Sequence, residues 1–262
     1  MNWLGKNMRR PIPLRVLQGP AAAERERNTS RPVMLVGFQN QGNLGLGYLA
    51  AVLRQYGYSV QVVDIEQPPE EILAIAKRIN PLLVGFSLIF QFFIDRYSAL
   101  LYVMRLHGVD CHFTMGGHFP SLSYQQTLEL VPELDSVVRF EGEMTLLDLA
   151  DAISTGKDWR DIHGLAYRRD QEAILTPPRA LIEDLDELPY PERDYQPETV
   201  LGRSIMSILA SRGCASCRSR CWHPASPTKA MSFAPATAPR ATTCMISSTA
   251  WCGCACRVPS SA

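Results

Sequence analysis

Five short apolar runs alternate with five amphipathic stretches between residues 32 and 156, and this alternation limits the possible folds more than any other feature. Short apolar runs without a polar face are typical of strands that are buried on both sides. Strands that alternate with helices build a parallel sheet with helices on both faces. The sequence therefore predicts an α/β domain with a doubly wound, five-stranded parallel sheet. The expected strands are residues 33–38, 59–64, 82–87, 111–115 and 136–140, and the expected helices are residues 44–56, 69–79, 94–106, 122–131 and 143–154.

The rest of the chain divides into an extension, a connecting region and a tail. The first residues lack hydrophobic periodicity, which indicates a flexible extension. Beyond the domain, a predicted β-hairpin is followed by a proline-rich linker and then by the first strand of a second module. The expected boundaries are 1–31 for the extension, 32–156 for the domain, 157–203 for the hairpin (residues 162–175) and linker, 204–214 for the start of the second module, and 215–262 for an unfolded tail.

The zero net charge of the chain hides an uneven distribution. Residues 1–198 contain 19 basic and 26 acidic side chains, whereas residues 199–262 contain seven basic and no acidic side chains. An acidic body without a basic stripe argues against a nucleic-acid-binding protein. No apolar stretch reaches the ~20 residues of a spanning helix, so no membrane span is expected.

Seven of the eight cysteines lie between Cys214 and Cys256. This spread is unlike that of a disulfide-stapled secreted protein and favours a cytoplasmic location.

Small and polar residues gather where the predicted strands end, and ligands of open α/β sheets bind beyond these carboxyl ends. The first strand is followed by the glycine-rich residues 39–47, the third ends at Ser87, and the fourth is followed by Gly116 and Gly117. Taken singly, a glycine can serve close packing or a turn, and Ser87 can cap a helix. Taken together, these loops predict a broad groove for a large flat ligand with an anionic tail.

Other common uses of this fold were compared with the same loops. A phosphate-binding P-loop is excluded, because no Gly-Lys-Ser/Thr sequence is present. A phospho-receiver domain is excluded because the third strand does not end in an acceptor Asp. The glycine order Gly42-x-x-Gly45-x-Gly47 differs from that of a dinucleotide site, but Asp64 stands where a ribose-binding acid would. An NAD-binding or sugar-nucleotide-binding domain of the oxidoreductase type therefore remains an alternative.

An ordered set of short segments between residues 32 and 214 resembles the cobalamin-binding domain of cobalamin-dependent radical S-adenosylmethionine enzymes. The resemblance implies a Rossmann-like or flavodoxin-like cobalamin-binding fold. It also implies that a corrinoid lies over the carboxyl edge of the sheet, with its nucleotide tail reaching between the sheet and its helices. The segments are residues 45–54, 84–87, 116–120, 141–143, 164–168, 184–191 and 210–214.

The resemblance also implies the residues that hold the corrinoid. Related corrinoid proteins supply a lower axial histidine from Asp-x-His-x-x-Gly, but the matching positions here are Asn40, Gly42 and Gly45. Cobalamin is therefore expected to bind without a protein imidazole, above a side chain near residues 43–44. Ser87 would hydrogen-bond the base of the tail, and the paired glycines would leave space for it. The expected cofactor-binding residues are Asn40, Gly42, Asn43, Leu44, Gly45, Ser87, Leu88, Gly116, Gly117, His118, Glu141, Gly142 and Glu143.

Enzymes of this family carry Cys-x3-Cys-x2-Cys in their second half. The three cysteines hold a 4Fe-4S cluster that binds and cleaves S-adenosylmethionine, and methyl-transferring members then methylate a small-molecule substrate. Here the spacing is reversed, with Cys214, Cys217 and Cys221 as the candidate metal ligands. A zinc site that adds the cysteines at positions 252, 254 and 256 does not match common zinc spacings.

The 48 residues after Cys214 contain no Leu, Asp, Glu, Asn, Gln or Tyr, so they lack the periodicity that a folded core needs. A related barrel needs on the order of 200 residues. We therefore expect that the reading frame changes just after Cys214 and that this chain is a binding domain without catalysis. The resemblance implies that full-length relatives are enzymes. The sequence does not identify catalytic residues or a substrate.

Overall fold

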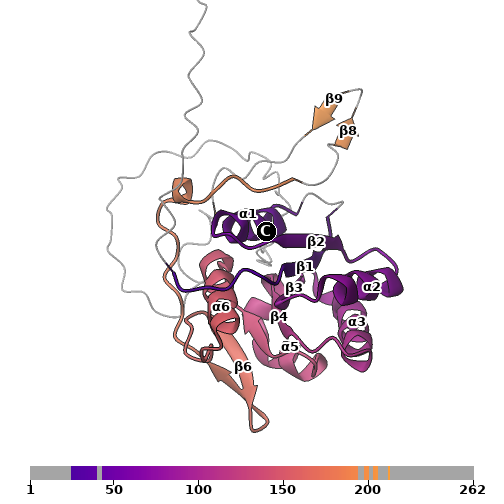
Figure 1. Ribbon diagram of the computed structural model, residues 1–262, viewed down its shortest axis with the longest axis vertical. Helices are drawn as coiled ribbons and strands as arrows, with labels where there is room; N and C mark the ends of the chain where they lie inside the picture. The colour runs from indigo at the N-terminus through magenta and orange to yellow at the C-terminus, as the bar shows by residue number, and fades with distance from the viewer. Residues whose placement is uncertain (1–24, 40–42, 194–197, 201–202, 206–211, 213–262) are drawn as a thin grey trace, which may run out of the picture.

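A seven-stranded sheet forms the centre of the computed structural model, which describes residues 25–39, 43–193, 198–200, 203–205 and 212. The strand order is β2-β1-β3-β4-β5-β6-β7 (Figure 1). Neighbours among the first five positions run parallel, whereas β5, β6 and β7 pair antiparallel. The strands are β1 (Val33–Gly37), β2 (Val60–Asp64), β3 (Leu83–Ser87), β4 (His112–Gly116), β5 (Ser136–Val138), β6 (Leu165–Arg169) and β7 (Glu172–Leu175).

The sheet thus has seven strands and not the five predicted, although five strands do form its parallel part. The two additional strands are the hairpin predicted at residues 162–175, which pairs with β5 and extends the sheet. Without β6, the buried strand β5 would leave its backbone groups unpaired at an open edge. The local sequence predicts the hairpin, but it does not show that β5 requires the hairpin as its second neighbour in the sheet.

Helices cover both faces of the sheet, as the doubly wound prediction requires. Val33 and Leu35 of β1 pack with α1 and α6 on one face, while Met34 and Val36 pack with α2, α3 and α5 on the other. All four side chains are fully buried, because alternate residues of a strand point to opposite faces. The helices are α1 (Leu44–Gln55), α2 (Pro69–Ile79), η1 (Gln91–Phe93), α3 (Ile94–Leu106), α4 (His118–Leu122), α5 (Tyr124–Leu130), α6 (Glu143–Thr155) and η2 (Leu185–Glu187).

The helix predicted at residues 122–131 is α5, and a short helix that was not predicted, α4, directly precedes it. Ser123 separates them with a φ of −125°, which is outside the helical range. Its carbonyl oxygen accepts hydrogen bonds from both the backbone N–H and the hydroxyl of Thr127, and these bonds start the second helix. Pro120 is tolerated because it lies in the first turn of α4, where a backbone N–H has no helical partner.

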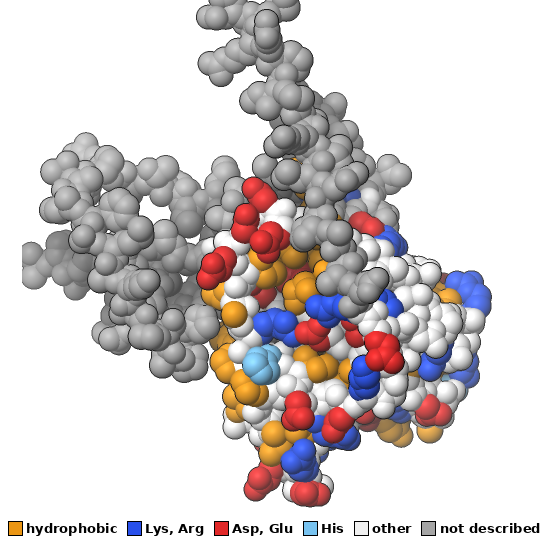
Figure 2. Space-filling model, turned by 60° about the vertical axis from the view of Figure 1, so that its left-hand side comes forward, with side chains coloured by type: hydrophobic (Ala, Val, Ile, Leu, Met, Phe, Trp, Pro, Cys, Tyr) orange, Lys and Arg blue, Asp and Glu red, His pale blue; other side chains and the backbone are white. Residues whose placement is uncertain are grey.

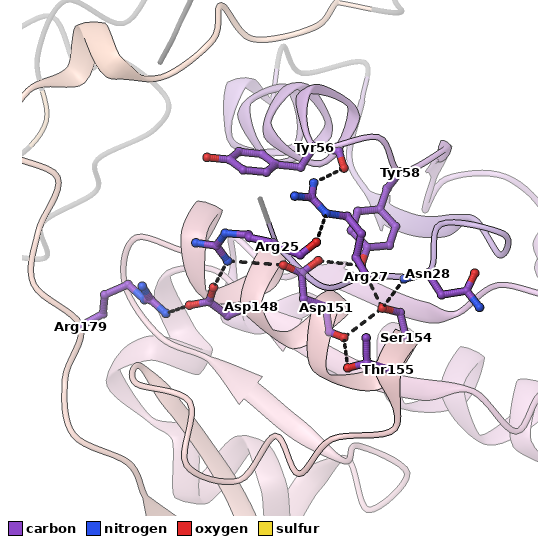
Figure 3. Close-up of polar contacts among 10 residues, drawn as sticks. All are labelled: Arg25, Arg27, Asn28, Tyr56, Tyr58, Asp148, Asp151, Ser154, Thr155 and Arg179. Atoms are coloured by element: carbon purple, nitrogen blue, oxygen red, sulfur yellow. Dashed lines mark hydrogen bonds and ion pairs between the residues drawn. The ribbon is translucent and has the colours of Figure 1, made fainter. Parts of the chain in front are cut away.

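The segment at residues 25–31 and the linker after β7 are both attached to α6 through one carboxylate (Figure 3). Asp148 of α6 pairs with Arg25 from the first segment and with Arg179 from the linker. The hydroxyl of Tyr58 donates a 2.8 Å hydrogen bond to Asp151, one helical turn further along α6. These contacts hold two distant chain segments against the same face of the domain. Residues 1–24 of the predicted extension lie outside the described residues.

A separate pair of short antiparallel strands follows the linker. It consists of β8 (Glu198–Val200) and β9 (Arg203–Ile205). The strand predicted from residue 204 onward therefore overlaps β9. The rest of that segment apart from Arg212, and the predicted unfolded tail at residues 215–262, lie outside the described residues.

A histidine at the amino end of β4 makes stability depend on pH. The ring Nε2 of His112 lies 2.8 Å from the Ser136 hydroxyl, and the ring packs edge-on against Trp159. Burial lowers the pKa of His112 to about 4. In the unfolded chain its pKa returns to about 6.5, so the unfolded state takes up a proton that the folded state excludes. The stabilisation is complete above pH 6.5 and is lost as the pH falls toward 4.

We predict that His112→Asn flattens the pH dependence of unfolding. Between pH 7 and pH 4.5 the wild-type protein should lose about 2 kcal/mol more than the variant does. Urea unfolding at several pH values measures this difference. The exposed His163 provides the matched control, His163→Asn, which should follow the wild-type curve. Parallel curves for wild type and His112→Asn would contradict the interpretation.

Candidate functional site

Three strands end in small residues that lie side by side at the carboxyl edge of the sheet. Gly37 at the end of β1 is in register with Ser87 of β3, which is in register with Gly116 of β4. The chain order reverses at β1 and β3, because β2 lies on one side of this pair and β4 on the other. Ligands of doubly wound sheets bind at such a switch point. The parallel register thus places Gly37, Ser87 and Gly116 side by side where the sequence predicts the site. We call these three residues the rim.

Two predicted site residues meet at this rim. Asn43 caps the N-terminus of α1, where its side-chain oxygen accepts a 3.3 Å hydrogen bond from the Leu46 N–H. Its amide nitrogen lies 3.5 Å from the Ser87 hydroxyl, so it donates a long hydrogen bond to β3. A Cβ at Gly45 would lie 3.2 Å from the capping oxygen, so glycine leaves room for the cap. Asn40 and Gly42, which precede this cap, lie outside the described residues.

The backbone of Ser87 is held in place by a hydrogen bond from a buried side chain. Its carbonyl oxygen accepts a 2.7 Å hydrogen bond from the hydroxyl of Tyr97, a side chain of α3 that is fully buried. Burial raises the pKa of Tyr97, so the hydroxyl remains a donor at neutral pH. The rim at the end of β3 therefore rests on a fixed hydrogen bond from the core.

The two leucines among the predicted site residues are buried. Leu44 at the start of α1 is 3% exposed, and Leu88 after β3 is fully buried. The backbone N–H of Leu88 donates a 2.9 Å hydrogen bond to the Gly116 carbonyl oxygen, which ties β3 to β4 beyond their ladder. Both side chains therefore belong to the packing of the domain, whereas Asn43, Ser87 and Gly116 are partly exposed at the rim.

Gly116 and Gly117 have different surroundings. Gly117 has a φ of 116°, and a Cβ there would collide with the Leu88 carbonyl group, whose carbon would be only 2.8 Å away. Gly116 has no positive φ, and the nearest atom to its Cβ position is the Val138 oxygen at 3.4 Å. Gly117 is therefore required by the close approach of two backbones, whereas Gly116 leaves ordinary space at the rim. His118 follows directly as the first residue of α4.

An aromatic cluster borders the rim, and the sequence reasoning missed it. Phe38 after β1 packs against Phe93, whose ring centroid is 4.5 Å away. Phe92 contacts both Phe90 and Phe93, and it is 73% exposed. The signal in the sequence was the continuation of the apolar run beyond the end of the third strand. A large exposed aromatic side chain at a binding edge is a common feature of ligand sites.

The acidic turn after β5 is joined to a residue from the far end of the described chain. Arg212 lies 2.5 Å from a carboxylate oxygen of Glu143 and 3.4 Å from one of Glu141. Burial by itself would lower the pKa of Arg212, but the two carboxylates outweigh burial and raise it. The predicted residues Glu141 and Glu143 are thus paired with an arginine. Gly142 between them is closely packed, since its Cβ would lie 3.1 Å from Val138.

Asp64, the residue that kept the nucleotide alternative open, has a structural partner. It ends β2 and is 8% exposed. One of its carboxylate oxygens accepts a 2.9 Å hydrogen bond from the backbone N–H of Glu66. The carboxylate therefore stabilises the turn after β2 within its own loop.

A hollow of about 830 Å³ lies at the opposite, amino end of the sheet. Arg105 lines this hollow. Its side chain already donates hydrogen bonds to three backbone carbonyls and to Asp135. Cys111 in the same hollow has a pKa raised by burial to about 11, so its thiol is protonated. These groups serve the structure of the loops around β4 and β5.

Within the described ranges, no group of three metal-ligating side chains is close enough to hold a metal ion. The predicted ligands Cys214, Cys217 and Cys221 lie outside these ranges, so the cluster stays a prediction. No described helix is long and apolar enough to cross a membrane. Figure 2 shows acidic and basic side chains intermingled on the face that it draws.

The strand order 2-1-3-4-5 and the rim at its switch point define a doubly wound, flavodoxin-like ligand-binding domain. Residues 31–150 match the model of the B12 binding domain family. An uncharacterized methyltransferase of Pyrococcus horikoshii is 31% identical over 177 residues, which make up 65% of this chain and 38% of that protein. The anaerobic magnesium-protoporphyrin IX monomethyl ester cyclase of Synechocystis is 30% identical over 161 residues, or 55% of this chain and 30% of the cyclase.

A similar fold occurs in the solved structure of OxsB, a cobalamin-dependent S-adenosylmethionine radical enzyme with aqua-cobalamin and S-adenosylmethionine bound. It is 24% identical, with a TM-score of 0.55 over 63% of this chain and 25% of that one. The match to the B12-binding domain family covers residues 31–150, which is slightly less than half of the chain. The resemblance to the cobalamin-binding domain of radical S-adenosylmethionine enzymes is confirmed, and nothing in these comparisons favours the nucleotide alternative. The chain spans less than half the length of these curated relatives.

The two adjacent glycines give a matched test of the rim. We predict that Gly117→Ala lowers the free energy of unfolding by about 2–4 kcal/mol, because it adds a backbone clash to an unfavourable φ. Gly116→Ala should change it by less than about 1 kcal/mol, since its Cβ meets only ordinary contacts. Denaturant unfolding of both variants measures the difference. Equal effects of the two substitutions would show that the close approach to Leu88 is not required.

Proposed function

We propose that residues 31–150 bind a corrinoid over the carboxyl edge of the sheet. The observation that carries this proposal is the rim of Gly37, Ser87 and Gly116 at the switch point of a domain that matches the B12-binding family model. Ser87 and Gly116 are partly exposed at this edge, while Gly37 is buried and allows the close approach of Leu46 and Ser87. The flanking Phe92 adds an exposed apolar surface that suits the face of a large ring.

The groups at the rim fit such a ligand in chemistry and in space. The amide of Asn43 and the hydroxyl of Ser87 are both partly exposed and supply donors and acceptors for a nucleotide tail. Gly116 leaves room next to them, whereas the space at Gly117 is filled by the backbone of Leu88. The proposal therefore places the tail beside Ser87 and Gly116. A bound corrinoid supplies a cobalt centre that can carry an alkyl group.

This chain's own residues would bind and orient the ligand. The Tyr97 hydrogen bond fixes the backbone carbonyl of Ser87, and the Ser87 hydroxyl would face the ligand from this fixed backbone. Asn43 would keep its capping bond to α1 and offer its amide nitrogen to the ligand in place of the long bond to Ser87. Preorganised donors lose little conformational entropy on binding, which increases affinity.

We also propose that the domain serves a radical S-adenosylmethionine enzyme, either a methyltransferase or an enzyme for another radical reaction of a small molecule. The relatives named above as a methyltransferase and a cyclase support this range of reactions. A cytoplasmic location and a frame change after Cys214 remain predictions. Sequencing the gene across codons 205–262 tests the frame change.

Corrinoid retention tests the proposed function. After incubation with hydroxocobalamin and desalting, the protein should keep the corrinoid absorbance band, and it should not retain NAD. Ser87→Ala should weaken the affinity about fivefold through the loss of one hydrogen bond. Gly116→Ala should weaken it further by narrowing the rim.

Ser59→Ala is the control for Ser87→Ala, because Ser59 is exposed at the amino end of β2. It should bind like the wild type. A folded protein that keeps no corrinoid band, or a Gly116→Ala variant with unchanged affinity, would refute the placement.

A further inference from the structure

Arg212 is seated among side chains from two separate elements of the domain. Glu141 and Glu143 lie in the turn after β5 and at the first position of α6, while Tyr48 comes from α1. The guanidinium carbon of Arg212 lies 5.2 Å from the centre of the Tyr48 ring. The side chain of Arg212 is 20% exposed, and that of Glu143 is 7% exposed. The contact is thus largely shielded from solvent.

The acidic turn is shaped for this contact independently of Arg212. Phe140, which precedes it, has a φ of 62°, a left-handed conformation that is unfavourable for a residue with a side chain. Its N–H donates a 2.8 Å hydrogen bond to the Ser121 hydroxyl, which holds the turn in place. The second carboxylate oxygen of Glu141 accepts a 2.7 Å hydrogen bond from the Ile182 N–H of the linker. The turn therefore has a fixed geometry before the arginine binds.

Charge makes the contact selective for an arginine. Glu143 is buried at the first position of α6, and a buried carboxylate without a cation is strongly destabilising. The N-terminus of α6 partly compensates one negative charge, but two carboxylates share this turn. A guanidinium has several N–H donors in one plane, so a single side chain can reach both acids and stack on Tyr48.

The linker approaches the same place along a defined path. The N–H of Glu192 donates a 3.1 Å hydrogen bond to the carbonyl oxygen of Gly47 on α1. A Cβ at Gly47 would lie 3.1 Å from Pro191 and collide with the Glu192 carbonyl group, so glycine allows the crossing. The chain therefore crosses α1 one residue from Tyr48, and Arg212 returns to the same helix.

We propose that Arg212 is a positioning residue, and that the turn of Glu141 and Glu143 is the socket that attaches the start of the next module to the corrinoid edge. Arg212 is two residues before Cys214, the first candidate cluster ligand, and two peptide units span at most about 7 Å. The socket belongs to the loop that leaves β5 at the same edge as Ser87 and Gly116. This inference rests on the proposed function for its meaning, but the socket itself exists without a corrinoid.

Tryptic cleavage of the Arg212–Gly213 bond in corrinoid-free protein measures the occupancy of the socket. The seated arginine should be protected from the protease. We expect Glu141→Gln and Glu143→Gln to increase the cleavage rate at this bond by roughly tenfold or more, which corresponds to the loss of a charge-assisted hydrogen bond. Arg212→Lys should be cleaved at an intermediate rate, because a single ammonium group cannot reach both acids as a guanidinium can.

Glu187→Gln is the matched control, since Glu187 is an exposed acid of the same linker. It should leave the cleavage rate at Arg212 unchanged. Circular dichroism and denaturant unfolding establish that each variant is folded. Glu141→Gln is the milder change if Glu143→Gln loses stability, because its side chain is 16% exposed.

Equal cleavage of the wild type and both glutamine variants, with folded protein in each case, would overturn the socket. Because no corrinoid is present, this result is independent of the proposed function. A protein that retains hydroxocobalamin but shows no protection at Arg212 would refute only the socket. A protein that shows protection but retains no corrinoid would refute only the proposed binding.

Discussion

The parallel ladder of β1 between β2 and β3 is the constraint on which the rest of the structure depends. It buries Val33 to Val36 completely, with alternate side chains directed to two helical layers. The same ladder sets the register that places Gly37 beside Ser87, and through β4 beside Gly116. A shift of one residue would exchange the two faces and would also break up the rim. Core packing and the candidate site are therefore fixed by one set of backbone hydrogen bonds.

Much of the fold follows from local sequence. The boundaries of α2 and α3 agree with the predicted ranges, because their apolar periodicity ends at clear signals such as the left-handed Asn80 after α2. The predicted capping region at Asn43 and the predicted strand end at Ser87 also lie together. These features depend on residues close in sequence or on the regular geometry of parallel strands.

The features that sequence reasoning missed depend on contacts between distant residues. The hairpin joins the sheet because β5 requires a second neighbour. Asp148 joins two arginines that lie far from it in the chain, and Glu143 binds Arg212. Gly117 was expected to leave space, but its surroundings show that it serves the packing of Leu88. A pattern of residue types indicates that such groups are available, but it does not indicate their partners.

The shared carboxylate of Asp148 has a consequence for the architecture of larger proteins. Because Arg25 and Arg179 meet on it, the segment that precedes β1 and the segment that follows β7 lie on the same flank of α6 (Figure 3). A unit whose ends are neighbours can be joined to different catalytic modules, or inserted between them, with little distortion of its interior. By pairing with both arginines, Asp148 thus gives the domain an arrangement of its flanking segments that suits use beside different modules.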